Sequence, residues 1–571
     1  MLLNGWIDNA AELSQQLGVP ADNAGRLYGA AHDRWGDDAD LHLIGDYCAV
    51  IDQAEAGVVR LSRSPWKAPP LHYFCDGKQL VAASVPRALH AAGIPAELDR
   101  RKVIDNHFLD LTADRGWYQG CYQVQLASSV TLTRESRKPR VYYDMLAPRK
   151  TELASPAEYV EAGEALLVEA CKATLSGSQT PGIMLSGGLD SSNVAARLLD
   201  CLAPDGMLKS FTFRPLAEFE APPDIGQFGD DGPAVEAFAQ MHPRLEAYFS
   251  RNEGIGFDAQ LEKMFLATGV APWPLPNMYH YHSLLAEARQ QGCDLLLWAD
   301  FGNIAISSDA NHAYYEFLVT GKWRKWWRSF APRARRTRSK RHFIAGSILS
   351  PMMPDWLWKL QRRWRGKATA TSNERIGTLR SSVIEEHGLR DHARRAGVHY
   401  GRERIRNRQE EIALFLTRGD SNYADTLQGF EQIYGIDMRD VTAYRPLLEF
   451  CLGLPTEAFM HDGQNRWLAR ELGKGRMPEE QRLNLKQGMH SGDWHERMTP
   501  RLSELRVQIE AAARDPQLNT IIDFEQILEA FDDWPEHGSY DDDALFRFLM
   551  APTRAIMTKR FVDFVSGKNS G

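Results

Sequence analysis

A glycine turn between an apolar run and a helix-forming run constrains the fold of this chain more than any other feature. Residues 181–193 are PGIMLSGGLDSSN. The run Ile183 to Leu185 predicts a buried strand, and the residues from Asp190 onward predict the start of a helix. A strand, a glycine turn and a helix in this order are typical of an α/β protein with a parallel sheet.

The polar groups of this turn indicate a phosphate site. We expect the hydroxyls of Ser186, Ser191 and Ser192, with the amides of the first helical turn, to point at one spot, where a pyrophosphate would be held. We expect Gly187 and Gly188 to adopt backbone angles that other residues avoid. Their lack of a side chain would also let an anion come close to the main chain.

The motif matches neither of the common nucleotide turns, GxxxxGKS/T and GxGxxG. SGGxDSS instead resembles the signature of ATP pyrophosphatases. This resemblance implies that ATP is cut between its α and β phosphates to make an acyl-adenylate. The alternative is an ordinary Gly-Ser turn between a strand and a helix. The resemblance and the strand ends give the following nucleotide-binding residues: Leu185, Ser186, Gly187, Gly188, Asp190, Ser191, Ser192, Thr212 and Gly302.

Length and charge narrow the class of protein. At 571 residues the chain exceeds what one hydrophobic core usually organises, so two or more domains are expected. A net charge of −8 argues against general nucleic-acid binding. There is no apolar run of about 18 residues, so neither a membrane span nor a membrane partner is expected.

The seven cysteines are scattered, odd in number and never spaced as CxxC. This pattern favours reduced thiols over a disulfide framework or a zinc site. The start of the chain does not have the pattern of a secretory signal. Together these features predict a cytoplasmic protein.

Residues 1–150 are predicted to form a β-rich domain of two packed antiparallel sheets. Short strand-like runs occur at 40–51, 57–62, 71–74 and 80–83. The order GDYCAVID, RLSRSPWKAPPLHYF, QLVAASVPRAL resembles the N-terminal glutaminase domain of the asparagine synthetase superfamily. That domain uses an N-terminal cysteine as nucleophile. This chain begins with Met1 and has no cysteine before Cys48, so we expect an inactive domain kept for packing.

Residues 151–571 are predicted to form the second domain, an ATP-pyrophosphatase domain with a parallel sheet and flanking helices. Ser155 and Glu158 form a capping box that opens a helix. Leu208 to Phe213 and Asp294 to Trp298 are predicted strands. Ligands bind beyond the carboxyl ends of such strands. The predicted fold class is therefore α/β, with an N-terminal antiparallel β-sandwich and a C-terminal parallel sheet.

The segment LLLWADFGNIAISS follows the second of these strands. It is similar to the SGEGSD motif of asparagine synthetases, with Asp300 at the acidic position and Asn303 at the final aspartate. The resemblance implies that magnesium pyrophosphate is held here, with Asp190 and Asn303 as metal ligands. The terminal asparagine resembles the lasso-peptide cyclase branch. The alternative is that these residues only cap a buried strand.

Two C-terminal segments, 428–455 and 461–494, also resemble the superfamily in its lasso-peptide cyclase form. Val441 and Tyr444 depart from the usual proline and aspartate. By resemblance to β-lactam synthetase and its relatives, Lys486 would be the positive group beside the pyrophosphate. Glu431, with Asp300, would supply the base. The alternatives are an exposed surface lysine and a structural glutamate.

The stretch 321–367 has the most biased amino-acid composition of the chain, because Arg, Lys and Trp are interleaved along it. It is interpreted as a basic insertion. Three interpretations remain open. It is a solvated helical face or mobile insertion, a docking surface for a substrate peptide or partner protein, or an RNA-binding surface.

The resemblance as a whole implies a lasso-peptide cyclase that uses ATP and Mg²⁺. Such an enzyme adenylates an Asp or Glu side chain of a precursor core peptide and closes a macrolactam with the N-terminal amine. A leader peptidase and a leader-binding protein would be its partners. The alternatives are a β-lactam synthetase-like or ammonia-dependent amide ligase acting on a small carboxylate, and a non-catalytic scaffold.

Overall fold

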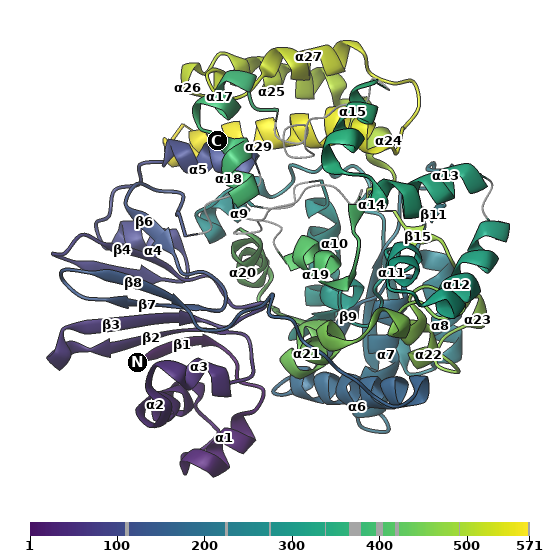
Figure 1. Cartoon of the computed structure of the whole chain (residues 1–571). Coiled ribbons are helices and arrows are strands. Elements are labelled where there is room, and N and C mark those ends of the chain that lie inside the picture. Colours follow the sequence, from purple (N-terminus) through teal and green to yellow (C-terminus); the bar gives the residue numbers. More distant parts are fainter. Residues whose placement is uncertain are drawn as a thin grey trace.

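The computed structural model describes residues 1–108, 114–222, 226–272, 276–336, 339–364, 378–395, 404–416, 422–489 and 491–568. Its architecture is α/β. Antiparallel sheets occupy the N-terminal part, and a parallel sheet flanked by helices occupies the rest (Figure 1). This is the predicted fold class.

Two antiparallel sheets face each other in the N-terminal part. The larger has the order β1 (Leu2–Gly5), β2 (Tyr47–Gln53), β3 (Val58–Arg63), β7 (Ser128–Leu132), β8 (Arg137–Val141), and the smaller β5 (Leu80–Ala83), β4 (His72–Cys75), β6 (Cys121–Gln123). Apolar side chains from both sheets share one core, which includes Leu61 and Tyr73. The prediction of two packed antiparallel sheets is confirmed.

Among the described residues, these sheets are accompanied by the helices α1 (Ala10–Leu17), α2 (Ala24–Trp35), α3 (Ala39–His42), α4 (Pro86–Ala91) and α5 (Arg100–His107). The prediction of one extended run from Asp40 to Ile51 is wrong at its start, because Asp40 belongs to α3. The Asp40 carboxylate is buried, and it accepts hydrogen bonds from Tyr28 and Ser62. This polar contact holds the segment in a helical turn below the sheet.

The parallel sheet has the order β12 (Leu245–Ser250), β10 (Leu208–Phe213), β9 (Pro181–Met184), β13 (Leu295–Trp298), β14 (Asp437–Asp440). Every neighbouring pair is parallel. The strands predicted at 183–185, 208–213 and 294–298 are therefore present, within one or two residues at their ends. The central strand, β9, is the one that leads into the glycine turn.

Helix α6 (Pro156–Leu175) begins at the predicted capping box. The Ser155 hydroxyl accepts from the Glu158 amide. In return, the Glu158 carboxylate accepts from the Ala154 amide at 3.0 Å. These contacts satisfy the Glu158 amide, which the first turn of the helix leaves unpaired, and the Ala154 amide just before the helix.

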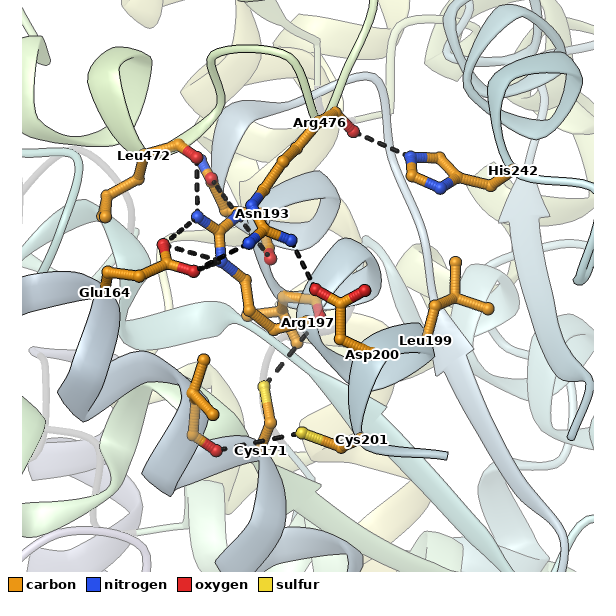
Figure 2. Close-up of polar contacts among 12 residues, drawn as sticks. Glu164, Cys171, Asn193, Arg197, Leu199, Asp200, Cys201, His242, Leu472 and Arg476 are labelled. Atoms are coloured by element: carbon orange, nitrogen blue, oxygen red, sulfur yellow. Dashed lines mark hydrogen bonds and ion pairs between the residues drawn. The ribbon is translucent and has the colours of Figure 1, made fainter. Parts of the chain in front are cut away.

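A buried arginine joins α6 to α7 (Leu189–Cys201), the helix that follows the glycine turn (Figure 2). Arg197 has no exposed side-chain surface and pairs with Glu164. It also donates to Asn193 Oδ1 at 2.8 Å and to the Leu472 carbonyl at 2.6 Å. Arg476, which is partly exposed, pairs with Glu164 at 3.1 Å. The network fixes the helix that supports the turn.

We expect Arg197→Met to lower the free energy of unfolding by about 3 kcal/mol, because removing one partner of a buried pair leaves the other partners unsatisfied. Arg476→Met is the matched control. Its side chain is 36% exposed, so its loss is expected to cost less than about 1 kcal/mol. Urea unfolding followed by tryptophan fluorescence measures both. Equal effects of the two substitutions would contradict this account of the network.

The remaining helices cover the parallel sheet and form a C-terminal bundle (Figure 1). They are α8 (Gly232–Met241), α9 (Leu261–Thr268), α10 (Met278–Gln290), α11 (Ala313–Val319), α17 (Ser381–Glu386), α18 (Leu389–Arg395), α19 (Arg408–Leu416), α20 (Tyr423–Tyr434), α21 (Arg445–Gly453), α22 (Trp467–Leu472), α23 (Glu479–Leu483), α24 (Trp494–Met498), α25 (Leu502–Ala513), α26 (Pro516–Asn519), α27 (Phe524–Asp532), α28 (Asp542–Ala544) and α29 (Ala551–Val565). Within the described ranges, none of the helices combines the length and the apolar character needed to cross a bilayer.

The described part of the basic insertion is mostly helical. It contains α12 (Trp323–Arg336), α13 (Lys340–Ile344), α14 (Ser350–Met352) and α15 (Asp355–Trp364). Residues 337–338 and 365–367 of the insertion lie outside the described residues. The seven cysteines are free thiols, as predicted.

Candidate active site

The glycine turn lies at the carboxyl edge of the parallel sheet, at its centre. Directly after β9, the Leu185 amide donates to the Phe211 carbonyl at 3.0 Å. The Thr212 hydroxyl donates to the Leu185 carbonyl at 2.8 Å. The structure therefore brings together Leu185 and Thr212, two of the residues assigned to nucleotide binding.

Hydrogen bonds within the turn define its shape. The Ser186 and Ser191 hydroxyls lie 3.0 Å apart, and the Gly188 amide donates to Ser186 Oγ at 3.2 Å. Ser192 has a different environment, because its buried hydroxyl accepts from the Gln481 side chain at 2.8 Å. The structure thus joins Ser186 and Ser191 and gives Ser192 a partner elsewhere.

The glycines of the turn have a packing role. Neither Gly187 nor Gly188 has a positive φ, so the predicted requirement for unusual backbone angles is wrong. A Cβ on Gly187 would instead lie 2.9 Å from the Ala234 Cβ, which is too close. The Gly187 amide donates to Asp231 Oδ1 at 2.7 Å. The Gly187 amide, which the sequence assigned to a phosphate, therefore already donates its hydrogen bond to the Asp231 carboxylate.

Asp190, in the first turn of α7, is buried beside the glycine turn. Its Oδ2 accepts from the Ser307 hydroxyl at 2.7 Å, whereas its Oδ1 is buried with no hydrogen-bond partner among the described residues. Burial raises the pKa of this carboxyl to about 6. A buried carboxylate oxygen without a partner fits a magnesium ligand, since Mg²⁺ prefers oxygen donors.

Gly302 allows the acidic segment to approach Asp190. A Cβ on Gly302 would lie 2.3 Å from the Asp190 Cγ. Asn303, the next residue, is exposed. The segment 300–303 is therefore packed against the turn, as its assignment to the same site requires. No group of three or more His, Cys, Asp or Glu side chains in the described part of the chain is arranged to hold a metal ion.

Asp300 lies at the carboxyl end of β13 and contacts two side chains from distant parts of the chain. Its Oδ2 accepts from Lys67 Nζ at 3.0 Å and from the Tyr423 hydroxyl at 2.7 Å. The Asp300 side chain is 53% exposed, whereas that of Lys67 is 6% exposed. The Asp300 carboxylate is thus open to solvent, and it is paired with a buried cation.

Asp440 completes this cluster at the end of β14. Its buried Oδ2 accepts from the Asp300 and Phe301 amides, both at 3.1 Å, and lies 3.7 Å from Lys67 Nζ. The pKa of Asp440 is raised, chiefly by burial, and the Lys67 charge opposes the rise. The ammonium also lies 4.1 Å from the Tyr423 ring centroid. Lys67 therefore compensates a buried carboxylate and orients an exposed one.

Lys67, Tyr423, Asp440 and Ser307 are site residues that the sequence did not identify. Lys67 belongs to the N-terminal part, and nothing in SPWKAPP indicates a partner 233 residues away. Arg439 and Asp440 belong to the segment 428–455, which resembles the superfamily. This resemblance is the sequence feature that could have identified Asp440 as a site residue. Arg439 itself points to the Thr174 carbonyl, at 3.0 Å.

The segment that carries Lys486 runs beside the glycine turn. Strand β15 (Gln487–Gly488) pairs in parallel with β11 (Gln227–Phe228), which is close in sequence to Asp231. The Gln487 side chain donates to Asp309 at 3.0 Å, and Arg466 donates to the same carboxylate at 2.6 Å. Lys486 is exposed. Lys486 therefore directly precedes a strand that lies beside the turn, and its side chain is open to solvent.

Glu431 lies toward the opposite edge of the sheet. Its carboxylate accepts from the Met438 amide at 3.0 Å, near the amino end of β14. Burial raises its pKa to about 7. Along α20 it is about 12 Å from Tyr423, at about 1.5 Å per residue. The structure does not bring Glu431 into the cluster of Asp300 and Asp190.

In α/β proteins, ligands bind at the carboxyl edge of a parallel sheet, and this chain carries its serine-glycine turn and the buried Asp190 at that edge. The asparagine synthase family model matches residues 162–558. The chain belongs to the asparagine synthase family, and so to a superfamily of ATP-using amide ligases.

Two curated relatives match parts of the chain. One is a putative glutamine-hydrolyzing asparagine synthetase 2 of Methanocaldococcus jannaschii, 22% identical over 221 residues, which are 37% of this chain and 40% of the relative. The other is the amidase chyE of Penicillium rubens, 30% identical over 167 residues, which are 28% of this chain and 24% of the relative. The chain thus spans less than half the length of either relative.

Among solved structures, a glutamine phosphoribosylpyrophosphate amidotransferase from B. subtilis, complexed with ADP and GMP, overlaps 43% of this chain and 70% of its own. Its TM-score is 0.21 and its identity 12%.

Proposed function

We propose that this chain is an ATP-dependent, AMP-forming macrolactam synthetase of the lasso-peptide cyclase type. It would activate an Asp or Glu side chain of a precursor peptide and join it to the peptide's N-terminal amine. The observation that carries the proposal is the buried Asp190 carboxylate beside the serine-glycine turn, with Gly302 packed on it and Asp300 exposed next to it.

Bound Mg²⁺ and ATP would supply a leaving group for an otherwise unreactive carboxylate. Within this chain, Asp190 would hold the cation through its unpartnered Oδ1, and Asn303, the exposed residue that follows Gly302, would add a second oxygen ligand. Ser186 and Ser191 would orient phosphate oxygens at the turn. Binding would require the Gly187 amide to exchange Asp231 for a phosphate oxygen.

The attacking amine must lose a proton, and Asp300 is the better placed of the two predicted bases. Its carboxylate is exposed and held by Lys67 and Tyr423 at the same edge as Asp190. Glu431 is bound to a backbone amide at the other edge. Proton transfer requires the base to lie within hydrogen-bonding reach of the amine.

Asp300→Asn is therefore expected to lower product formation by about 10²-fold, and Glu431→Gln by less than about threefold. Both substitutions preserve shape, so each serves as the control for the other. Single-turnover formation of product with pre-bound ATP measures the step. A larger loss in Glu431→Gln would reassign the base.

Lys486 is proposed to neutralise the departing pyrophosphate. Its exposed position beside the turn gives it the necessary freedom. We expect Lys486→Ala to lower the rate by about 10²-fold, the effect of losing one preorganised electrostatic contact. Lys474→Ala, another exposed lysine of the C-terminal part, is the control and should retain activity. Unchanged rates in Lys486→Ala would remove this residue from the mechanism.

A tethered amine is favoured over ammonia by the chemistry of the N-terminal part. Cys48 is buried, and burial raises its pKa to about 11, so its thiol stays protonated near neutral pH. Such a thiol is a poor nucleophile for glutamine hydrolysis. We propose that residues 1–150 are a non-hydrolytic domain that supplies Lys67 to the ligase domain, residues 151–571.

Pyrophosphate release tests the proposal. It is expected only with a peptide that carries both a free N-terminal amine and an internal acidic side chain. Release with a small carboxylate and ammonia would favour the β-lactam synthetase-like or asparagine synthetase-like alternative. Release with neither class of substrate would favour a scaffold. The proposed precursor peptide, leader peptidase and leader-binding protein are the partners to supply in the assay.

A further inference from the structure

The basic insertion concentrates positive charge in an otherwise acidic protein. Residues 321–367 contain 15 Lys and Arg residues and one acidic residue, whereas the whole chain has a net charge of −8. The rest of the chain therefore carries a net charge of −22. In Figure 1, α12 and α13 lie at the right of the molecule, and α14 and α15 continue from them toward the C-terminal helices at the top. The net charge of this insertion is therefore opposite in sign to that of the rest of the chain.

Large apolar side chains are exposed on the same helices. In α12, Trp323 and Trp327 are 62% and 61% exposed. Being four residues apart, they lie on one face of the helix. On the inner face, Trp326 stacks on Phe330 with ring centroids 4.9 Å apart. Trp326 and Phe330 thus pack α12 onto the protein, whereas Trp323 and Trp327 remain largely exposed to solvent.

Helix α15 shows the same pattern more strongly. Trp356, Leu360 and Trp364 are 68%, 54% and 93% exposed, and their spacing of four residues places them in one stripe. Between the two helices, Leu349 and Met352 are 52% and 54% exposed. These seven residues, from Trp323 to Trp364, together with Arg324, Arg335, Lys340 and Arg341, are called the α12–α15 face.

Some of the basic residues are paired within the protein. Lys322 and Lys325 both contact Glu457 at 2.8 Å, and Arg328 pairs with Asp462 at 2.5 Å. Arg324, Arg335, Lys340 and Arg341 are exposed, and no acidic side chain pairs with them in the described part of the chain. These four residues can contribute their charge to a partner.

We propose that the α12–α15 face docks the protein onto an anionic phospholipid surface. Helices that combine exposed Trp and Leu with Lys and Arg lie in the interface of such bilayers, with apolar side chains in the acyl boundary and cations at the phosphates. Leu349, Met352 and Leu360 favour lipid over RNA, whose bases stack on aromatic side chains and whose phosphates gain nothing from aliphatic ones.

The charge of the remaining molecule would orient this contact. A surface with a net charge of −22 is repelled by anionic headgroups, so the α12–α15 face is the side that can approach them. The expectation of no membrane partner was drawn from the absence of a spanning segment, and surface docking needs none. This proposal does not depend on the reaction that the enzyme performs.

Co-sedimentation of the full chain with vesicles tests the proposal. Binding is expected to vesicles that contain phosphatidylglycerol, at least about tenfold tighter than to phosphatidylcholine alone, and to weaken with salt. A stripe variant, Trp356→Ser/Leu360→Ser/Trp364→Ser, and a charge variant, Arg335→Glu/Lys340→Glu/Arg341→Glu, are each expected to lose about tenfold or more.

The matched control is Leu2→Ser/Val141→Ser/Val507→Ser, which removes three apolar side chains that are 73%, 69% and 64% exposed outside the face. It should bind as the unmodified chain does. Equal binding to both kinds of vesicle would overturn the proposal, as would undiminished binding of the stripe variant. Retention on polyuridylate without vesicle binding would overturn it in favour of RNA.

Discussion

Replacing Asp190 with Asn is expected to lower ATP-dependent pyrophosphate release by about 10³-fold, the largest effect of any single substitution in this chain. Asp190 Oδ1 is buried without a partner, and Oδ2 is held by Ser307. The amide has the same shape but no negative charge, so it binds Mg²⁺ poorly. Pyrophosphate release with peptide, ATP and Mg²⁺ measures the loss.

Cys48→Ala is the control for this experiment. Its thiol is buried and its raised pKa of about 11 keeps it neutral, so activity should be unchanged. Because the charged form of Asp190 is the disfavoured form in the folded protein, Asp190→Asn should not lower the free energy of unfolding. A folded Asp190→Asn protein with normal release would contradict the assigned site.

The pKa of Asp190 also sets a pH dependence. Because burial raises this pKa to about 6, the carboxyl is protonated at lower pH. A cation must displace that proton, so the apparent affinity for Mg²⁺ should fall about tenfold for each pH unit below 6. Titration of Mg²⁺ with ATP analogues across this range tests the expectation. Asp190→Asn should remove the dependence.

Replacing Lys67 with Met is expected to lower the rate by about 10²-fold or more, although Lys67 lies outside the segment that matches the family model. Loss of the ammonium leaves Asp440 buried without its cation and removes one of the contacts that hold Asp300. Breaking such a buried pair is costly because the remaining carboxylate stays desolvated. The pKa of Asp440 should rise further as a result.

Lys78→Met, at an exposed position between β4 and β5, is the matched control and should leave the rate unchanged. The pH profile separates a local effect from unfolding, because a raised pKa of Asp440 moves the acid limb of the profile to higher pH. A Lys67→Met protein with the unmodified rate and profile would show that the N-terminal part does not contribute to the site.

Local pattern was sufficient to predict three of the five strands of the parallel sheet, whereas β12 and β14 were not predicted. The runs at 183–185, 208–213 and 294–298 are short and apolar, and each ends at a polar turn. The capping box at Ser155 was predicted because the helix start is set by residues close in sequence. The prediction of an extended run from Asp40 was wrong because the buried Asp40 carboxylate, which accepts hydrogen bonds from Tyr28 and Ser62, determines the conformation of this segment.

The site was predicted in part for the same reason. The turn and Asp190 form a continuous motif, and their neighbour Gly302 follows a recognisable strand. Lys67 and Tyr423 meet Asp300 only after folding, and no spacing in the sequence indicates this contact. The sequence identified the glycines of the turn. It did not predict why glycine is required at Gly187, because the contact with Ala234 forms only in the folded protein.

Analysis of the products formed from ATP tests the central claim most directly. The full chain, incubated with Mg²⁺, ATP and a peptide bearing a free amine and an acidic side chain, should yield AMP and pyrophosphate in step with loss of water from the peptide. Formation of ADP and phosphate would contradict cleavage between the α and β phosphates. It would also remove the chemical role assigned to the turn at Ser186 and to Asp190.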